Sequence, residues 1–212
     1  MPVKTPSVHR RRFLAAMAAP ALAPLASGTE EGFVSLFNGT DLAGWEGDPF
    51  LWKVEDGMLI GRSPGIPYND FLTTDREFSD FVLRFEIHLL NDVGNSGVQI
   101  RSRRVAGSME MIGYQADIGP TWWGSLYDES RRRITLAEPA EATLRRALKP
   151  DAWNEYEVSA IGKRIVLKLN GTVTVDYTEE DDSIEQTGLI GLQVHSGPPL
   201  ESRFRNIRIQ DR

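Results

Sequence analysis

Four stretches of the sequence place planar hydrogen-bonding side chains at alternate positions. They are Arg84, Glu86 and His88; Gln99 and Arg101; Gln115 and Asp117; and Gln193 and His195. The residues between them are apolar, which predicts strands with one apolar and one polar face. Amides, carboxylates and guanidinium groups can each hold two neighbouring hydroxyl groups, and a sugar presents such pairs at its edge. The pattern therefore indicates a carbohydrate site on a sheet face.

Aromatic residues follow one of these stretches closely in the sequence. Trp122, Trp123 and Tyr127 come shortly after Asp117. An aromatic ring packs against the apolar C–H face of a sugar, so we expect Trp123 and Tyr127 to contact the ligand. The alternative for either tryptophan is to cap the core, where this residue type is usually found.

The polar positions also have a simpler interpretation. A sheet face that only meets water carries polar residues too, and opposite charges on it form ion pairs, for example Arg84 with Glu86. For His88 and His195 the corresponding alternative is an imidazole held by a neighbouring carboxylate. The sequence leaves both interpretations open.

Short strands separated by turns are expected to position these groups. Asp56-Gly57 and Asn170-Gly171 predict tight hairpins, because these pairs accept the positive φ angles of a type I′ turn. Residues 81–89 alternate strictly between apolar and polar, as a half-buried strand does. Further strands are expected at Gly97–Arg103, Gly113–Ile118, Glu155–Ala160, Leu189–His195 and Phe204–Gln210, and one short helix at Glu138–Leu148. This spacing favours an all-β, two-sheet antiparallel sandwich with one short helix.

The first 28 residues have the composition of an export signal. Arg10 and Arg11 precede Phe13-Leu14, and an uncharged apolar run extends over residues 15–26. This pattern predicts a twin-arginine signal peptide over residues 1–28 and a single domain over residues 29–212. A basic, disordered start is the alternative. The apolar run is too short to span a bilayer, so no membrane anchor is expected after export.

Charge and composition exclude several classes of function. The sequence has 24 basic and 30 acidic residues and no cysteine, which excludes disulfides, thiolate metal sites and a cysteine nucleophile. All basic residues before position 29 precede the first acid, Glu30, so the predicted mature chain is more acidic still. A nucleic-acid partner is therefore not expected. We expect an acidic periplasmic or secreted protein.

A series of short motifs resembles the 3-keto-disaccharide hydrolase domain family, which was formerly a domain of unknown function. The motifs are Leu36–Trp45, Trp52–Gly57, Phe78–Phe81, Gly94–Ser102, Gly113–Asp117, Gly124–Tyr127, Trp153-Asn154, Leu169–Gly171, Gly191–His195 and Phe204–Ile207. The resemblance implies a concanavalin-A-like jelly roll that acts on glycosides oxidised at carbon 3. Many members carry a carboxylate where this chain has Gln115, so the identity of the base is open.

The implied substrate suggests roles for the polar residues. A ketone at carbon 3 acidifies the hydrogen on carbon 2, so a base can remove it and the enolate can expel the glycosidic oxygen from carbon 1. Under this mechanism His195, Asp117 or Glu86 would move the proton, and Arg101 would hold the negative charge. The residues expected to bind the sugar are Gln99, Gln115, Gln193, His88, Trp123 and Tyr127.

Two other functions remain as alternatives. A lectin-like carbohydrate-binding module would use the same face without catalysis, and an ordinary glycosidase would need paired carboxylates instead. No cofactor is expected to be required. Glu86, His88, Asp117 and His195 could ligate a divalent cation, but no ligand spacing demands one.

Overall fold

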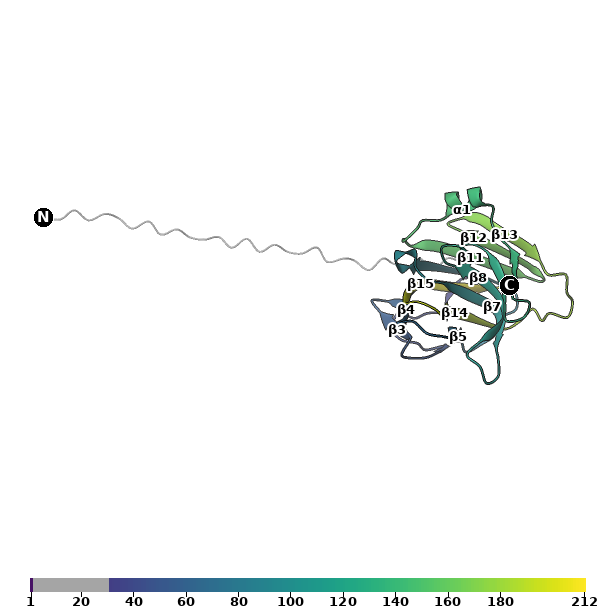
Figure 1. The fold of residues 1–212 in the computed structure, drawn as a ribbon, viewed down its shortest axis with the longest axis horizontal. Helices are drawn as coiled ribbons and strands as arrows, with labels where there is room; N and C mark the ends of the chain where they lie inside the picture. Colours follow the sequence, from purple (N-terminus) through teal and green to yellow (C-terminus); the bar gives the residue numbers. More distant parts are fainter. Residues whose placement is uncertain (2–30) are drawn as a thin grey trace.

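Two antiparallel sheets pack face to face in this protein (Figure 1). The computed structural model describes Met1 and residues 31–212. Residues 2–28 of the predicted signal peptide, and its boundary, lie outside the described residues. Within the described part, no helix is long and apolar enough to cross a membrane.

Sheet A has the strand order β13-β12-β11-β6-β15-β4-β3, with β1 paired to β15. Its strands are β1 (Val34–Ser35), β3 (Trp52–Glu55), β4 (Met58–Ser63), β6 (Phe81–Leu89), β11 (Asn154–Ile161), β12 (Arg164–Leu169), β13 (Thr172–Thr178) and β15 (Leu200–Asp211). Neighbouring strands are antiparallel throughout.

Sheet B has the strand order β10-β9-β8-β7-β14-β5-β2. Its strands are β2 (Trp45–Glu46), β5 (Asp70–Thr74), β7 (Ser96–Arg104), β8 (Met111–Ile118), β9 (Leu126–Glu129), β10 (Thr135–Ala137) and β14 (Leu189–Val194). A 3₁₀ turn, η1 (Leu90–Asp92), begins the connection from β6 in sheet A to β7 in sheet B.

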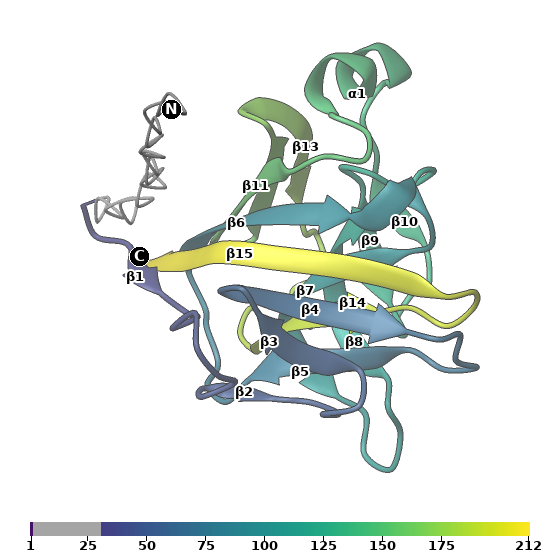
Figure 2. The same ribbon diagram turned by 90° about the vertical axis from the view of Figure 1, so that its left-hand side faces the viewer.

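The last two strands of the chain lie inside the sheets rather than at their edges. Figure 2 shows β15 running between β6 and β4, with β14 in the layer behind it. In sheet B, β14 lies between β7 and β5. Each sheet is therefore held together by a strand from the end of the described sequence.

The apolar faces of the two sheets form the core. In β6 the side chains of Phe81, Leu83, Phe85, Ile87 and Leu89 are buried, while the alternate residues are partly exposed. The ring of Phe85 stacks on Tyr156 of β11, with centroids 5.3 Å apart. Alternation in the sequence thus becomes a buried and a solvent-facing side, as predicted.

Both predicted hairpins are present. Asp56-Gly57 and Asn170-Gly171 have positive φ angles at both positions and join β3 to β4 and β12 to β13. The predicted helix is also found, over the shorter range α1 (Glu141–Ala147), because Ala140 is still extended. The prediction of an all-β, two-sheet antiparallel sandwich with one short helix is confirmed.

Candidate active site

A row of buried amides crosses the outer face of sheet B. Gln99 on β7 lies opposite Gln115 on β8, and the amide of Gln99 donates to Gln115 Oε1 at 2.8 Å. The amide of Gln115 in turn donates to Asp117 Oδ1 at 2.7 Å and to Gln193 Oε1 at 3.3 Å. All four side chains are at most 4% exposed. This network fixes the orientation of Asp117 from three different strands.

A pocket of about 220 Å³ opens above this row. It is lined by Asn95, Gln115, Asp117, Trp122, Tyr127, Glu129, Thr135 and His195. We call the lining residues together with Gln99 and Gln193 the site face. It combines planar polar groups with an aromatic ring, which is the composition that suits a sugar.

Asp117 is the most perturbed acid on the site face. Burial raises its pKa to about 7, opposed by the hydrogen bond from Gln115 and helped by the negative charge of Glu129. Among the described residues, Asp117 forms no ion pair, and one of its two oxygens receives a hydrogen bond. A carboxyl with a pKa near neutrality can take up and release a proton at physiological pH.

Glu129 is a second carboxyl in the same pocket. Burial raises its pKa, and the nearby Glu110 raises it further. The pKa of Tyr127 is raised too, first by burial and then by Glu129 and Asp117. Along the β8–β9 ladder, Gln115 pairs with Tyr127, and Asp117 and Glu129 stand on either side of this pair. The pocket thus holds two separate carboxyl groups with no compensating cation in its lining.

His195 presents one ring nitrogen to the pocket. Its Nδ1 lies 2.6 Å from the carbonyl oxygen of Ser196, a contact that assigns the proton to Nδ1. The backbone N–H of Ser196 donates to Asn69 Oδ1 at 2.9 Å, which fixes this turn. In this tautomer Nε2 is an acceptor available to a ligand.

Two buried polar atoms on the site face lack partners. Gln193 Nε2 and Asn95 Oδ1 have no hydrogen-bond partner of normal geometry in the described part of the chain. A buried donor or acceptor without a partner is unfavourable by about 1–3 kcal/mol. A ligand with hydroxyl and carbonyl oxygens would satisfy both atoms.

Glu86 and His88 do not belong to the site face, so the expectation of one shared polar face is wrong. Both lie on β6 and point outward from sheet A. Arg205 donates to Glu86 at 2.8 Å, and His88 Nε2 lies 2.9 Å from Asp151. The reason is the strand pairing, because β6 is hydrogen-bonded to β11 and β15 and therefore lies in the other sheet.

Arg101 is also turned away from the pocket, contrary to the expectation that it holds the ketone. A β-bulge interrupts β7 after Ile100, and Arg101 has a φ of 48°. Its guanidinium donates to the carbonyl oxygens of Ser79 and Gly162. Ser102 takes the position beside Gln99 and donates to Gln99 Oε1 at 2.6 Å.

Trp123, which was expected to contact the ligand, lies in the core instead. Trp123 is 2% exposed and part of the core, and its Nε1 donates to Asp92 at 2.8 Å. Trp122 is 40% exposed and lines the pocket. Trp122 is therefore the tryptophan whose ring is accessible in the pocket, because the turn after Gly119 directs the first ring outward and the second inward.

The sequence interpretation missed Glu129 and Asn95. Glu129 had a usable signal, because it follows Tyr127 at an alternate position and so shares its face in any strand through both. Asn95 lies within the Gly94–Ser102 motif, but its position just before β7 gave no strand alternation from which to predict its face. Among the described residues, no group of three or more potential metal ligands is close enough to hold an ion.

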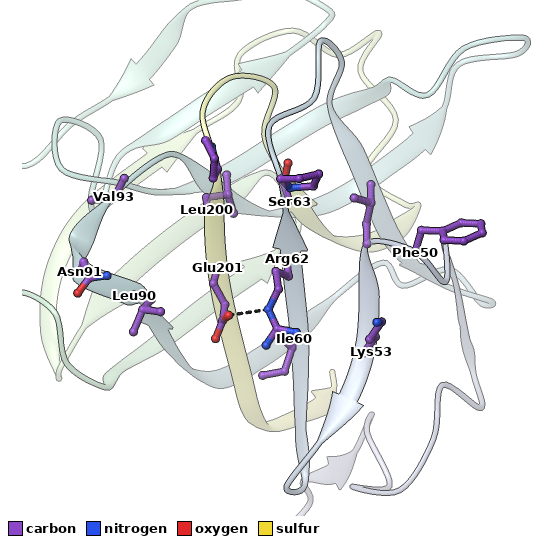
Figure 3. A pocket seen from close by; sticks show the side chains of 13 residues that line it. Phe50, Lys53, Ile60, Arg62, Ser63, Leu90, Asn91, Val93, Leu200 and Glu201 are labelled. Atoms are coloured by element: carbon purple, nitrogen blue, oxygen red, sulfur yellow. Dashed lines mark hydrogen bonds and ion pairs between the residues drawn. The ribbon is translucent and has the colours of Figure 1, made fainter.

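A larger cavity of about 500 Å³ lies on the outer face of sheet A (Figure 3). Its lining is mainly apolar and includes Phe50, Ile60 and Leu90. The one carboxylate in the lining, Glu201, accepts from Arg62 at 2.7 Å. With its acid neutralised in this way, the cavity is less suited to proton transfer than the site face.

Comparison with known proteins matches this chain to a family whose description names a carbohydrate reaction. Residues 32–210 match the family model described as the 3-keto-alpha-glucoside-1,2-lyase-like domain. No match is found among the curated proteins.

Solved structures with a similar fold include three from bacteria. A candidate glycosyl hydrolase from Parabacteroides distasonis has 19% identity and a TM-score of 0.66, over 86% of this chain and 94% of that one. The carbohydrate-binding module CBM66 from Bacillus subtilis has 20% identity and a TM-score of 0.60, over 79% and 96%. A Bacillus licheniformis beta-glucanase has 12% identity and a TM-score of 0.60, over 85% and 98%. These likenesses confirm the jelly-roll sandwich.

Proposed function

Because the chain belongs to the 3-keto-alpha-glucoside-1,2-lyase-like domain family, we propose that it cleaves the glycosidic bond of glycosides oxidised at carbon 3. One observation carries the proposal: Asp117 is a buried carboxyl with a pKa of about 7, in a pocket whose other groups suit a sugar. The substrate is a small 3-keto-glycoside such as a 3-keto-disaccharide.

Asp117 acts as the base in this mechanism. Its ionised carboxylate removes the hydrogen from carbon 2, which the neighbouring ketone has acidified. Gln115 holds one oxygen of Asp117 through the 2.7 Å hydrogen bond and leaves the other for the substrate. A base with a pKa near 7 is sufficiently ionised at neutral pH and still strong enough to accept the proton.

Gln193 supports the charge that develops on the ketone oxygen. Its Nε2 is buried near Glu129 and makes no hydrogen bond of normal geometry within the described residues, so it can donate to that oxygen as the enolate forms. Gln115 anchors the other end of the same amide by donating to Gln193 Oε1 at 3.3 Å. The donor is therefore positioned before the substrate arrives.

The remaining groups of the site face bind the sugar. His195 Nε2 and Asn95 Oδ1 accept hydrogen bonds from hydroxyl groups, and Trp122 packs on the ring. Expulsion of the glycosidic oxygen leaves an enone, to which water adds at carbon 1. The outcome is then hydrolysis, or a lyase reaction if the enone is released first.

The direct test is turnover of a purified 3-keto-glucoside. We expect release of the free alcohol together with 3-keto-glucose or the enone, and no cleavage of the same glycoside before oxidation. Cleavage of the unoxidised glycoside alone would instead identify an ordinary glycosidase. Binding of the 3-keto-glucoside without any product would favour a carbohydrate-binding module, the second candidate, which the structural likeness to CBM66 favours.

We further propose that residues 1–28 direct export by the twin-arginine route and that residues 29–212 form the periplasmic or secreted domain. The support is the sequence around Arg10-Arg11. Changing both arginines to lysine should block export of the precursor. Fractionation measures this, and unchanged periplasmic accumulation of the double variant would contradict the proposal.

A further inference from the structure

Breaking the glycosidic bond requires an acid as well as a base. The departing oxygen leaves with the electron pair of its bond to carbon 1, and an alkoxide is a poor leaving group unless it is protonated as it departs. Asp117, once it has taken the hydrogen from carbon 2, is occupied. The question is which other group in the pocket carries a transferable proton.

Two of the ionisable groups in the pocket are unsuited to this task. His195 donates from Nδ1 to the carbonyl oxygen of Ser196, and in this tautomer its Nε2 is an acceptor rather than a proton donor. Tyr127 holds its proton too firmly, since burial and the nearby carboxyls raise the pKa of the phenol above its ordinary value. Glu129 is the remaining ionisable group in the lining.

The geometry favours Glu129 in this role. It extends from β9, whereas Asp117 extends from β8, and the paired Gln115 and Tyr127 lie between them. Both carboxyls line the same pocket of about 220 Å³, so one bound sugar can meet the base at carbon 2 and the acid at the oxygen on carbon 1.

The surroundings of Glu129 keep its carboxyl protonated more readily than an exposed one. Burial and the nearby Glu110 raise the pKa of Glu129, and this outweighs the opposing effects of Ser130, whose Oγ lies 3.4 Å from Glu129 Oε1, and of Arg133 and Gln193. Asn69 reaches Glu110, at 3.4 Å. Among the described residues, no cation forms an ion pair with Glu129 or Glu110. The negative charge of Glu110 favours the neutral form of Glu129.

We propose that Glu129 is the catalytic acid that protonates the departing glycosidic oxygen. The inference rests on the proposed function. In the first step Asp117 gains the proton of carbon 2, the C–H electrons form the double bond between carbons 1 and 2, and the bond from carbon 1 to oxygen breaks. The oxygen keeps the electron pair of that bond and takes the proton of Glu129, which becomes a carboxylate.

The second step restores both groups. Water adds to carbon 1 and gives one proton to the Glu129 carboxylate, while Asp117 returns its proton to carbon 2. The sum is one glycoside and one water converted to a 3-keto-sugar and an alcohol. No oxidant, reductant or metal is needed for this balance.

The test compares two leaving groups in the full-length domain. A methyl 3-keto-glucoside needs an acid to expel methanol, whereas a 4-nitrophenyl 3-keto-glucoside expels a stable phenolate without one. For Glu129→Gln we expect kcat for the methyl substrate to fall by ~10²–10⁴-fold, while the nitrophenyl substrate loses far less. Glu155→Gln, an exposed change on β11 of sheet A, is the matched control and should affect neither substrate.

A second measurement separates this inference from the proposed function. Wild-type enzyme and Glu129→Gln should both exchange the hydrogen on carbon 2 of 3-keto-glucose with deuterated water, and Asp117→Asn should not. Retained exchange also shows that Glu129→Gln folds. If Glu129→Gln lowers kcat equally for the methyl and the nitrophenyl substrate, or for neither, Glu129 is not the acid. The proposed function would stand in either case. A wild-type protein with neither exchange nor cleavage would overturn both.

Discussion

The two outer faces of the sandwich have similar alternating polar sequences but opposite electrostatics. On sheet A, Glu157 accepts from Arg84 and from Lys168, each at 2.6 Å, and although burial opposes it these two cations lower the pKa of Glu157. On sheet B, Asp117 accepts from the Gln115 amide, Glu129 lies near Glu110, and burial raises the pKa of each.

The difference shows what distinguishes a reactive surface from a solvated one in this fold. The ion pairs of Glu157 on sheet A stabilise its charged form, so this group resists protonation. Asp117 on sheet B forms no ion pair within the described residues, so burial dominates and its proton moves near neutral pH. Burial likewise raises the pKa of Glu129. The presence of polar residues on a sheet face therefore does not show that the face is reactive. The ion-pair and hydrogen-bond partners of each carboxyl determine whether it can exchange a proton.

The largest expected effect compares carboxylates on the two faces. Asp117→Asn should lower kcat for a 3-keto-glucoside by ~10²–10⁴-fold, because it removes the base. Glu86→Gln should leave kcat near the wild-type value, since Glu86 pairs with Arg205 on sheet A. Steady-state kinetics on both variants measure this. Similar losses for the two would abolish the distinction between the faces.

A second comparison uses the adjacent tryptophans. Trp123→Ala should lower the free energy of unfolding by ~3–5 kcal/mol, because it empties a core position. Trp122→Ala should leave the melting temperature unchanged and raise KM, since its ring packs on the ligand. Thermal melts and kinetics on both variants provide the measurement. A lower melting temperature for Trp122→Ala with normal KM would place it in a structural role instead.

The pH dependence of stability should reveal Asp117 directly. Between its ordinary pKa of about 4 and its folded value of about 7, the folded protein holds this proton and the unfolded chain has lost it. The free energy of unfolding therefore falls as the pH rises through this window, by up to roughly 4 kcal/mol. Denaturant titrations at several pH values should show a shallower fall for Asp117→Asn. Identical slopes would argue against the raised pKa.

Activity should follow the same group. Because the base must be ionised, kcat/KM should decline as the pH falls below about 7, the pKa of Asp117. The decline should persist in His195→Ala, which keeps Asp117 while losing an acceptor for the sugar. If kcat/KM of His195→Ala no longer declines at low pH, His195 and not Asp117 is the base.

The smallest effect concerns the stability of sheet A. Breaking the Glu86–Arg205 pair with Glu86→Gln should change the free energy of unfolding by about 0–1 kcal/mol, as is usual for an exposed pair. Chemical denaturation of this variant is the measurement. A much larger loss would show that the ion pairs of sheet A hold the fold together.

The tight turns and the alternating strands could be predicted from the sequence, because backbone angles and side-chain alternation depend on neighbouring residues. The Asp56-Gly57 and Asn170-Gly171 turns need positive φ angles that few residue pairs accept, and the strand over residues 81–89 follows from alternation. The amides of Gln99, Gln115 and Gln193 were placed on one face for the same reason.

The wrong predictions concern side chains whose position depends on residues far away in the sequence or on local irregularities of a strand. The outward face of β6 could not be assigned to a sheet, because its partners β11 and β15 lie far along the chain. Arg101 was misplaced because a bulge leaves no mark in the alternation. The choice between Trp122 and Trp123 depends on one turn, whose direction is set by packing against the core.

The central positions of β14 and β15 also have a consequence for folding kinetics. Without these strands, β6 and β4 have no common neighbour in sheet A, and neither do β7 and β5 in sheet B. A partial chain emerging from the ribosome thus holds two halves of each sheet that cannot yet join. Such non-local pairing makes folding slow, typically milliseconds to seconds, and late. The pocket, which needs Gln193 and His195, forms only when the whole sandwich closes.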